Sequence, residues 1–211
     1  MQPLSDISLA YQCATTLGLT RTEVMEIARS APMRYKIYTI PKRNGGDRLI
    51  CQPSRELKTI QYYFLENILK NAPVHSCATA YEKGSSIKSN ASLHAAGRVI
   101  LKLDFRNFFN SITPHNWAAY VRQEMPTWSK QDLIFSCQVL FFGNRSISPK
   151  FLSIGAPSSP KIANVIMYRF DDAMEKYCQG INCVYTRYAD DITISSTGYI
   201  DTRSILQTVR V

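Results

Sequence analysis

The spacing of apolar and polar side chains divides this chain into helical segments and a few short strands. In the helical segments, apolar residues recur every three or four positions, as in a helix that buries one face. Pro126 separates two of these segments. The pattern predicts two short helices within 4–30, broken at Gly18 and Thr20, and further helices at 56–70, 115–125 and 130–141.

Three segments carry strand patterns instead. Tyr38–Ile50 has Asn44-Gly45-Gly46 near its centre, a turn sequence that predicts a β-hairpin. Apolar residues from Arg98 onward predict a buried strand that ends at Asp104. The segment Val184–Ser195 alternates apolar and polar residues around a short polar turn, and it predicts a second hairpin.

Another helix is predicted to begin near Pro160. Ser158 or Ser159 is suited to cap it, and Pro160 fits its first turn. Asp171 and Asp172 fall on different faces of this helix, and we interpret both as solvated surface. The apolar residues at helical spacing, which we interpret as core, are Ile162, Ile166, Phe170, Met174 and Tyr177.

Two adjacent carboxylates, Asp190 and Asp191, occupy the turn of the second predicted hairpin. Like charges this close repel each other, and Mg²⁺ is a hard cation that prefers carboxylate oxygen. If the strand that ends at Asp104 lies beside the hairpin, the three carboxylates can bracket a two-metal site for phosphoryl transfer. The alternatives are a solvated turn for the pair, and a strand end or helix cap for Asp104.

Composition supports a nucleic-acid partner without establishing one. Lys and Arg number 25 against 16 Asp and Glu, a formal net charge of +9, which favours phosphate contacts. The six cysteines have no CxxC spacing, which indicates neither zinc nor a disulfide framework and favours a cytoplasmic protein. No signal peptide or bilayer-length apolar run is evident, so we expect no membrane partner.

Five blocks of sequence occur in an order typical of one enzyme family. They are Arg48-Leu-Ile-Cys-Gln-Pro53 with Leu57, Lys58 and Gln61, then Gly84-Ser-Ser-Ile87 with Asn90-Ala-Ser-Leu-His94, then Lys102-Leu-Asp-Phe-Arg-Asn-Phe-Phe109, then Gly155-Ala-Pro-Ser-Ser-Pro160 with Asn164, and finally Tyr188-Ala-Asp-Asp191. In this order they resemble two fingers blocks and polymerase motifs A, B and C of reverse transcriptases. One four-residue motif is weak evidence, whereas five ordered blocks are strong. The chain is similar to the bacterial retron type, which is related to the group II intron enzymes.

The resemblance assigns roles to motifs A and C. It implies that Asp104, Asp190 and Asp191 are the catalytic, metal-binding carboxylates, and that the backbone carbonyl of Phe105 is a further ligand. Phe109 falls at the position of the family's aromatic steric gate, where a ring under the sugar clashes with a ribose 2′-hydroxyl. We interpret its neighbour Phe108 as core.

The resemblance also suggests contacts with the incoming nucleotide. Arg48 matches a triphosphate contact, and Lys42 stands before the same hairpin turn. For Arg43 we favour a solvated charge that protects the hairpin edge. Ser158 and Pro160 of motif B are further substrate-binding candidates.

Two features distinguish this chain within the family. Asn90 and His94 form the N-A-x-x-H pattern typical of retron enzymes, and they share a helix face if residues 87–96 are helical. We assign them a structural or RNA-positioning role, because metal-based chemistry needs no imidazole base. Ile154 replaces the glutamine that commonly precedes the motif B glycine, which removes one polar contact near the nucleotide and template.

The implied fold is α+β, a right-hand polymerase with fingers and palm, and an antiparallel palm sheet packed by helices. We expect N-terminal helices and fingers over 1–97 and a palm over 98–211, with a helical insertion at about 114–152. Twenty residues follow Asp191, so we expect the family's thumb to be absent from this chain.

The implied activity is that of an RNA-directed DNA polymerase that uses Mg²⁺ and deoxynucleoside triphosphates. Its template and primer would be a structured non-coding RNA, and its product a branched RNA–DNA. Retrons act against phage together with an effector protein, so such a partner is expected. The alternatives are a reverse transcriptase of group II intron or abortive-infection type, and a non-catalytic RNA-binding module.

Overall fold

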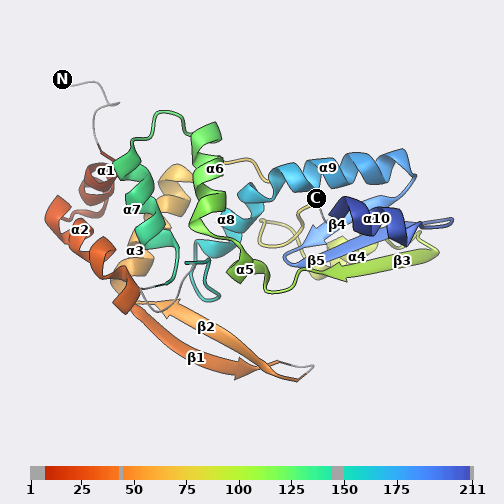
Figure 1. The fold of residues 1–211 in the computed structure, drawn as a ribbon, viewed down its shortest axis with the longest axis horizontal. Coiled ribbons are helices and arrows are strands. Elements are labelled where there is room, and N and C mark those ends of the chain that lie inside the picture. The colour runs from red at the N-terminus through yellow and green to blue at the C-terminus, as the bar shows by residue number, and fades with distance from the viewer. Residues whose placement is uncertain (1–7, 43–44, 144–149, 210–211) are drawn as a thin grey trace. The chain divides into compact units, whose positions relative to one another are not determined.

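The computed structural model describes residues 8–42, 45–143 and 150–209, and it combines helices with antiparallel strands (Figure 1). The helices are α1 Leu9–Leu17, α2 Arg21–Ser30, the 3₁₀-helix η2 Ala31–Met33, α3 Arg55–Tyr63, the π-helix η3 Phe64–Ile68, α4 Ile87–Leu93, α5 Phe108–Ser111, α6 Pro114–Glu124, α7 Lys130–Leu140, α8 Ser159–Ile166, α9 Tyr168–Gly180 and α10 Thr202–Val209. The strands are β1 Tyr35–Pro41, β2 Asp47–Pro53, β3 Val99–Asp104, β4 Val184–Tyr188 and β5 Asp191–Ser196.

The chain folds into two compact units that each combine distant segments. The first unit contains residues up to 72 together with 109–163, and the second contains 73–108 together with the residues from 164 onward. These units are defined by which residues contact one another in the structure. The functional division into fingers over 1–97 and palm over 98–211 stays a prediction.

The first unit has a helical core in which α1, α2, α3 and α7 contact one another. Leu57 and Phe64 bury their side chains there, and the indole N–H of buried Trp117 donates to the Ser136 hydroxyl at 2.9 Å. The Asp132 carboxylate in the first turn of α7 accepts the backbone N–H of Leu9 at 2.7 Å, which joins the starts of two helices. The predicted helices at 56–70, 115–125 and 130–141 are thus confirmed as α3 with η3, α6 and α7.

The predicted fingers hairpin is also confirmed in this unit. Strand β1 pairs antiparallel with β2 from Tyr35 opposite Pro53 to Pro41 opposite Asp47. Beyond the strands, the backbone N–H of Lys42 donates to the carbonyl oxygen of Gly46 at 2.9 Å. Gly46 has a φ of 77°, a value that glycine adopts without strain. Asn44 of the predicted turn and Arg43, which precedes it, lie outside the described part of the chain.

The second unit is built on a three-stranded antiparallel sheet with the order β3-β5-β4. Alternate residues of a strand point to opposite faces. Ile192 and Ile194 of β5 join an apolar cluster with Met174 of α9 and Ile205 of α10, two helices drawn beside the sheet in Figure 1. The intervening Thr193 and Ser195 face the other side, where α4 packs.

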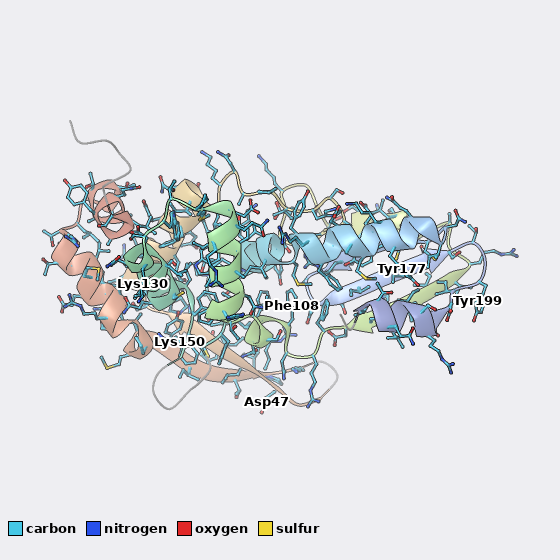
Figure 2. All side chains as sticks on the ribbon, turned by 45° about the horizontal axis from the view of Figure 1, so that its top comes forward. Asp47, Phe108, Lys130, Lys150, Tyr177 and Tyr199 are labelled. Atoms are coloured by element: carbon cyan, nitrogen blue, oxygen red, sulfur yellow. The ribbon has the colours of Figure 1, made fainter. Side chains whose placement is uncertain are left out.

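The helix predicted after Pro160 is interrupted. It consists of α8 and α9, separated at Met167, and Tyr177 near the end of α9 is labelled in Figure 2. Of the predicted stripe, Ile162 and Met174 are buried. The other three residues, Ile166, Phe170 and Tyr177, are half-buried.

The prediction of a solvated Asp171 was wrong, whereas that for Asp172 was right. Asp171 is fully buried in an ion pair with Arg187 of β4. The carboxylate of Asp172 is partly exposed and bonds the Lys176 ammonium at 2.8 Å on the helix surface. Helical spacing assigned the two residues to different faces correctly, but it gave no sign of the arginine that faces Asp171.

No helix in residues 8–42, 45–143 and 150–209 has the length and apolarity needed to cross a membrane. All six cysteines are free thiols, and none forms a disulfide.

Candidate active site

The three carboxylates predicted to bind metal meet at one end of the β3-β5-β4 sheet. Asp104, the last residue of β3, lies directly opposite Asp191, the first residue of β5. Asp191 is also paired with Tyr188, the last residue of β4, so Ala189-Asp190 forms a two-residue loop between the strands. Two segments far apart in the sequence therefore bring their acidic residues to the same sheet end.

The loop that carries Asp190 has an uncommon backbone conformation. Ala189 has a φ of 57°, in the left-handed region that residues with a Cβ rarely adopt. Tight two-residue hairpins need such a value in the loop, where glycine, asparagine or aspartate is usual. The backbone N–H of Phe105 donates to the carbonyl oxygen of Asp190 at 3.0 Å, which ties the loop to the residue that follows Asp104.

Electrostatic repulsion acts on this cluster. Partial burial raises the pKa of the Asp191 carboxyl above its usual value, and the charges of Asp190 and Asp104 raise it further. The folded chain therefore binds this proton more tightly than the unfolded chain. The resulting destabilisation is absent below the usual pKa of the carboxyl and is fully present once the pH exceeds the raised pKa. A cation at this sheet end would relieve it.

The donor set fits a hard divalent cation. Three carboxylates supply the oxygen ligands that such ions prefer. Burial, and after it the charges of Asp190 and Asp104, raise the pKa of Asp191, and the nearby Lys102 offsets this only in part. Asp104 and Asp191 are exposed, so ions from solvent reach them. Within the described residues, however, no three His, Cys, Asp or Glu side chains already converge closely enough to hold a metal ion. The metal-binding role of the cluster stays a prediction.

Behind the loop lies a buried ion pair that the sequence analysis missed. Arg187 of β4 and Asp171 of α9 are both 0% exposed, and Nε and Nη2 donate to the two carboxylate oxygens at 2.8 and 2.6 Å. Nη1 donates to the carbonyl oxygen of Ala189 at 2.9 Å and to Asn164 Oδ1 at 3.3 Å. One signal was available, since Arg187 shares the inward strand face with Tyr185, where a charge needs a buried partner.

The motif B loop packs closely on strand β2 within the first unit. The backbone N–H of Cys51 donates to the carbonyl oxygen of Ile154 at 2.9 Å. Gly155 has a φ of 112°, and a Cβ there would lie 3.1 Å from Cγ2 of Ile50. Only glycine combines this conformation with this close approach.

The start of α8 agrees only in part with expectation. Pro160 lies in the first turn of the helix, as predicted. Ser158 and Ser159 are buried, and their hydroxyls have no hydrogen-bond partner among the described residues, so the predicted side-chain cap was wrong. Position in the sequence identified where the helix begins but not the hydrogen bonds of these hydroxyls. The substrate-binding role of Ser158 and Pro160 stays a prediction.

The basic residues of the hairpin are solvent-exposed. Arg48 of β2 lies opposite Ile40 and shares a hairpin face with Ile50, which is the residue beside Gly155. Its guanidinium therefore lies on the face that packs against motif B. Lys42 directly follows β1. Contact of either side chain with a triphosphate stays a prediction, and Arg43 lies outside the described residues.

The aromatic residues after Asp104 have different surroundings. Phe108, labelled in Figure 2, is buried with its ring centroid 5.7 Å from that of Phe105 and 5.8 Å from the Arg187 guanidinium carbon, which confirms it as core. Phe105 is half-buried. Phe109 is half-buried in α5, and its role as steric gate stays a prediction. The role of the Phe105 carbonyl as a metal ligand also stays a prediction.

The N-A-x-x-H pattern ties α4 to the sheet. His94 is buried, with Nδ1 2.8 Å from the Ser195 hydroxyl and Nε2 2.8 Å from the Thr186 hydroxyl. Burial lowers the pKa of His94, so the ring is neutral at pH 7. The Thr79 hydroxyl donates to Oδ1 of Asn90 at 2.8 Å. RNA positioning by this pair stays a prediction, and His94 would serve it by fixing α4.

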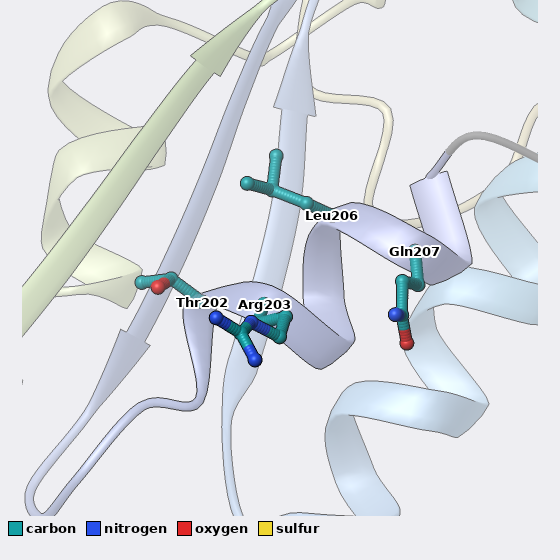
Figure 3. A pocket seen from close by; sticks show the side chains of 4 residues that line it. All are labelled: Thr202, Arg203, Leu206 and Gln207. Carbon is teal, nitrogen blue, oxygen red and sulfur yellow. The ribbon is translucent and has the colours of Figure 1, made fainter.

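A shallow hollow on α10 contains none of the predicted site residues. It is lined by Thr202, Arg203, Leu206 and Gln207, which Figure 3 shows along the helix. It lies away from the five sequence blocks along the chain, and we assign it no catalytic role.

The sequence profile of the reverse transcriptase (RNA-dependent DNA polymerase) family matches residues 40–211. The chain belongs to the reverse transcriptase family. Within the family it is similar to retron enzymes: it is 38% identical over 192 residues to the retron Ec83 reverse transcriptase of Escherichia coli. It is 36% identical over 188 residues to the retron Ec73 enzyme of Escherichia coli, and 30% identical over 211 residues to the retron Mx162 enzyme of Myxococcus xanthus.

These alignments cover 89%, 84% and 92% of this chain but only 61%, 58% and 43% of the three relatives. The chain thus spans about half the length of the curated relatives it matches.

Solved structures with the same fold are distant in sequence. A telomerase from Candida tropicalis, truncated from its C-terminal domain, aligns with a TM-score of 0.52 at 13% identity, covering 92% of this chain and 52% of that one. A telomerase from Candida albicans, solved with a fragment of telomeric RNA, aligns with a TM-score of 0.51 at 11% identity, covering 88% and 40%. At such identities the likeness concerns fold alone, and it confirms the predicted α+β polymerase fold of fingers and palm.

The contacts of His94 predict a large effect on stability. We expect His94→Ala to lower the free energy of unfolding by about 2–4 kcal/mol, because it leaves two buried hydroxyls unsatisfied and a cavity. Because the folded-state pKa is lowered, the stability that His94 contributes is present above its unfolded pKa and is lost as pH falls through the folded pKa. Urea denaturation at several pH values measures both effects.

The control for this variant is His115→Ala at an exposed position of α6, which should change stability by less than about 0.5 kcal/mol. A His94→Ala chain as stable as the wild type would contradict the proposed tie between α4 and the sheet.

The repulsion at the sheet end predicts a gain in stability when one charge is removed. Without divalent metal, Asp191→Asn should stabilise the chain by roughly 0.5 kcal/mol, a figure discounted because Asp191 is exposed. This corresponds to a rise in melting temperature of about 1–2 °C at neutral pH. Asp172→Asn, which removes an ion-paired surface carboxylate, should give no rise. A lower melting temperature for Asp191→Asn would show that the charges are already compensated.

Proposed function

We propose that this chain provides the fingers and palm of a retron reverse transcriptase, a metal-dependent RNA-directed DNA polymerase. The observation that carries the proposal is the strand register that places Asp104 opposite Asp191, beside the loop of Asp190. Membership of the reverse transcriptase family supports it.

The proposed metal is Mg²⁺, held by Asp104, Asp190 and Asp191 with the carbonyl oxygen of Phe105 as a further ligand. When bound, the metal ions activate the primer hydroxyl and neutralise charge on the phosphates. In the reaction, the primer hydroxyl would lose its proton to solvent while its oxygen bonds to the α-phosphorus of a deoxynucleoside triphosphate, and the bond from that phosphorus to the leaving pyrophosphate would break. The sheet contributes position, because strand pairing fixes the backbone of Asp104 and Asp191 before substrate arrives.

Other residues of the chain would bind the nucleotide. Arg48 and Lys42 supply exposed cations for the triphosphate, and the guanidinium suits a bidentate contact with phosphate oxygens. Phe109 would exclude the ribose 2′-hydroxyl. Ser158 and Pro160 of motif B would line the same site.

A structured non-coding RNA is the proposed template and primer, with a branched RNA–DNA as product. The formal net charge of +9 supports binding to a polyanion. Asn90 and His94 would position this RNA through α4. The names of the relatives support the retron assignment. By the same analogy we propose an effector protein as partner and a role in phage defence. We also propose a bacterial cytoplasmic location, and the free cysteine thiols agree with that location.

Primer extension on an RNA template tests the proposal. The wild-type chain with Mg²⁺ and deoxynucleoside triphosphates should extend a primer, and chelation of the metal should stop synthesis. Asp190→Asn and Asp104→Asn should each lower the rate about a hundredfold or more, because metal coordination supplies several kcal/mol of transition-state stabilisation.

The matched control is Asp172→Asn, since Asp172 is an ion-paired acidic residue on the surface of α9. It should extend the primer at the wild-type rate. RNA binding without any synthesis by the wild-type chain would favour the non-catalytic RNA-binding module instead.

A further inference from the structure

Arg187 is the centre of a fully buried polar network behind the Ala189-Asp190 loop. Its guanidinium donates to both oxygens of Asp171, to Asn164 and to the Ala189 carbonyl. The planar fork of arginine can satisfy these acceptors at once, which a lysine ammonium cannot do.

The backbone of Arg187 is held as firmly as its side chain. Its N–H donates to the carbonyl oxygen of Cys77, and its own carbonyl accepts the N–H of Thr79, both at 2.8 Å. The guanidinium therefore projects from a fixed point toward a fixed carboxylate. The contacts that hold the backbone and the side chain of Arg187 therefore also fix the position from which its guanidinium binds the Ala189 carbonyl.

Stability alone explains such a network poorly. Burying two charges costs about as much free energy as their attraction returns, and apolar replacements are often as stable. Ala189, meanwhile, stays in a left-handed conformation that costs about 1 kcal/mol or more for a residue with a Cβ. A strained loop residue persists when its surroundings over-determine it, and the Arg187 side chain supplies a direct bond to that residue.

The loop is thus held at two successive carbonyl groups. Arg187 binds the carbonyl oxygen of Ala189, and the backbone N–H of Phe105 binds that of Asp190. Fixing these two peptide planes fixes the direction in which the Asp190 side chain leaves the backbone.

We propose that Arg187 is a positioning residue for the divalent-metal site: by holding Ala189 in its left-handed conformation it keeps Asp190 and Asp191 oriented to bind the ion. Asp171 and Asn164 orient the guanidinium for this task. The inference rests on the proposed function in that it takes these carboxylates to be metal ligands. It adds a residue that neither touches the metal nor belongs to the five sequence blocks.

Binding of Mn²⁺ alone to the full chain tests the proposal directly. Mn²⁺ takes the same oxygen ligands as Mg²⁺, and electron paramagnetic resonance counts the free ion during a titration. Arg187→Lys should bind Mn²⁺ about tenfold more weakly than the wild type, as is typical when a residue that supports metal ligands is replaced. Wild-type affinity in this variant overturns the proposal.

A control separates positioning from lost stability. Ile205→Ala removes a buried side chain of α10 from the core of the same unit without touching the loop. It should lower the melting temperature but leave Mn²⁺ affinity within about twofold of the wild type, since no ligand moves. If Ile205→Ala weakens Mn²⁺ binding as much as Arg187→Lys does, Arg187 has no specific role.

A second substitution should restore what the first removes. Glycine adopts a positive φ without strain, so Ala189→Gly in the Arg187→Lys background should recover most of the lost Mn²⁺ affinity. A loss that Ala189→Gly leaves unchanged overturns the proposal.

If Arg187→Lys does not fold, the double variant Asp171→Asn with Arg187→Met replaces it. This variant removes both charges together and leaves no unpaired ion in the core. It too should bind Mn²⁺ about tenfold more weakly, and unchanged binding overturns the proposal. Asp190→Asn shows whether the measured Mn²⁺ is bound at these carboxylates, because this variant should lose that binding. If the wild-type chain binds no Mn²⁺ there, both the proposed function and the inference are wrong. If the wild type binds Mn²⁺ and the Arg187 variants bind it equally well, only the inference is wrong.

Discussion

Electrostatic repulsion among three carboxylates is the constraint on which the site depends. Asp190 and Asp191 are adjacent, and strand pairing brings Asp104 opposite Asp191, so the fold concentrates like charge that the nearby Lys102 offsets only in part. The sheet withstands this because apolar burial fixes its strands independently of the charges. Ile192 and Ile194, the residues that follow the acidic turn on β5, lie in the core beneath α9 and α10. A cation at this sheet end would recover the free energy that the repulsion costs the folded chain.

Polar groups hold the two faces of this sheet in different ways. On the α4 face, neutral His94 bonds two hydroxyls and attaches a helix whose own surface is mostly exposed. On the α9 face, a charged pair of Arg187 and Asp171 lies among apolar side chains. Buried polar contacts of this kind have directional requirements that apolar packing lacks, so they select one arrangement of the elements. The apolar cluster holds the strands together, and the polar contacts determine how helices and loop are oriented on them.

Local pattern predicted the elements well. Turn residues and alternation identified both hairpins, and helical spacing identified the helices of the first unit, because these signals depend on neighbours within a few positions. The meeting of Asp104 with the Asp190 loop was also predictable, since the ordered blocks resemble one family. Errors arose where the outcome depended on distant partners. Asp171 was predicted to be a surface residue because no residue near it in the sequence indicates its ion pair with Arg187. The Ser158 hydroxyl has no partner among the described residues, although its position suits a cap.

The order of the strands in the chain has a consequence for biosynthesis. Hairpin β1–β2 closes across a short turn and can form as soon as it leaves the ribosome. Strand β3 has no neighbour in its sheet until β5 is made, roughly 90 residues later, which at about 5–20 residues per second takes roughly 5–18 seconds. During that interval Leu101 and Leu103 lack the cluster that later covers them. The second unit therefore passes through a stage of synthesis in which these apolar side chains are open to a chaperone.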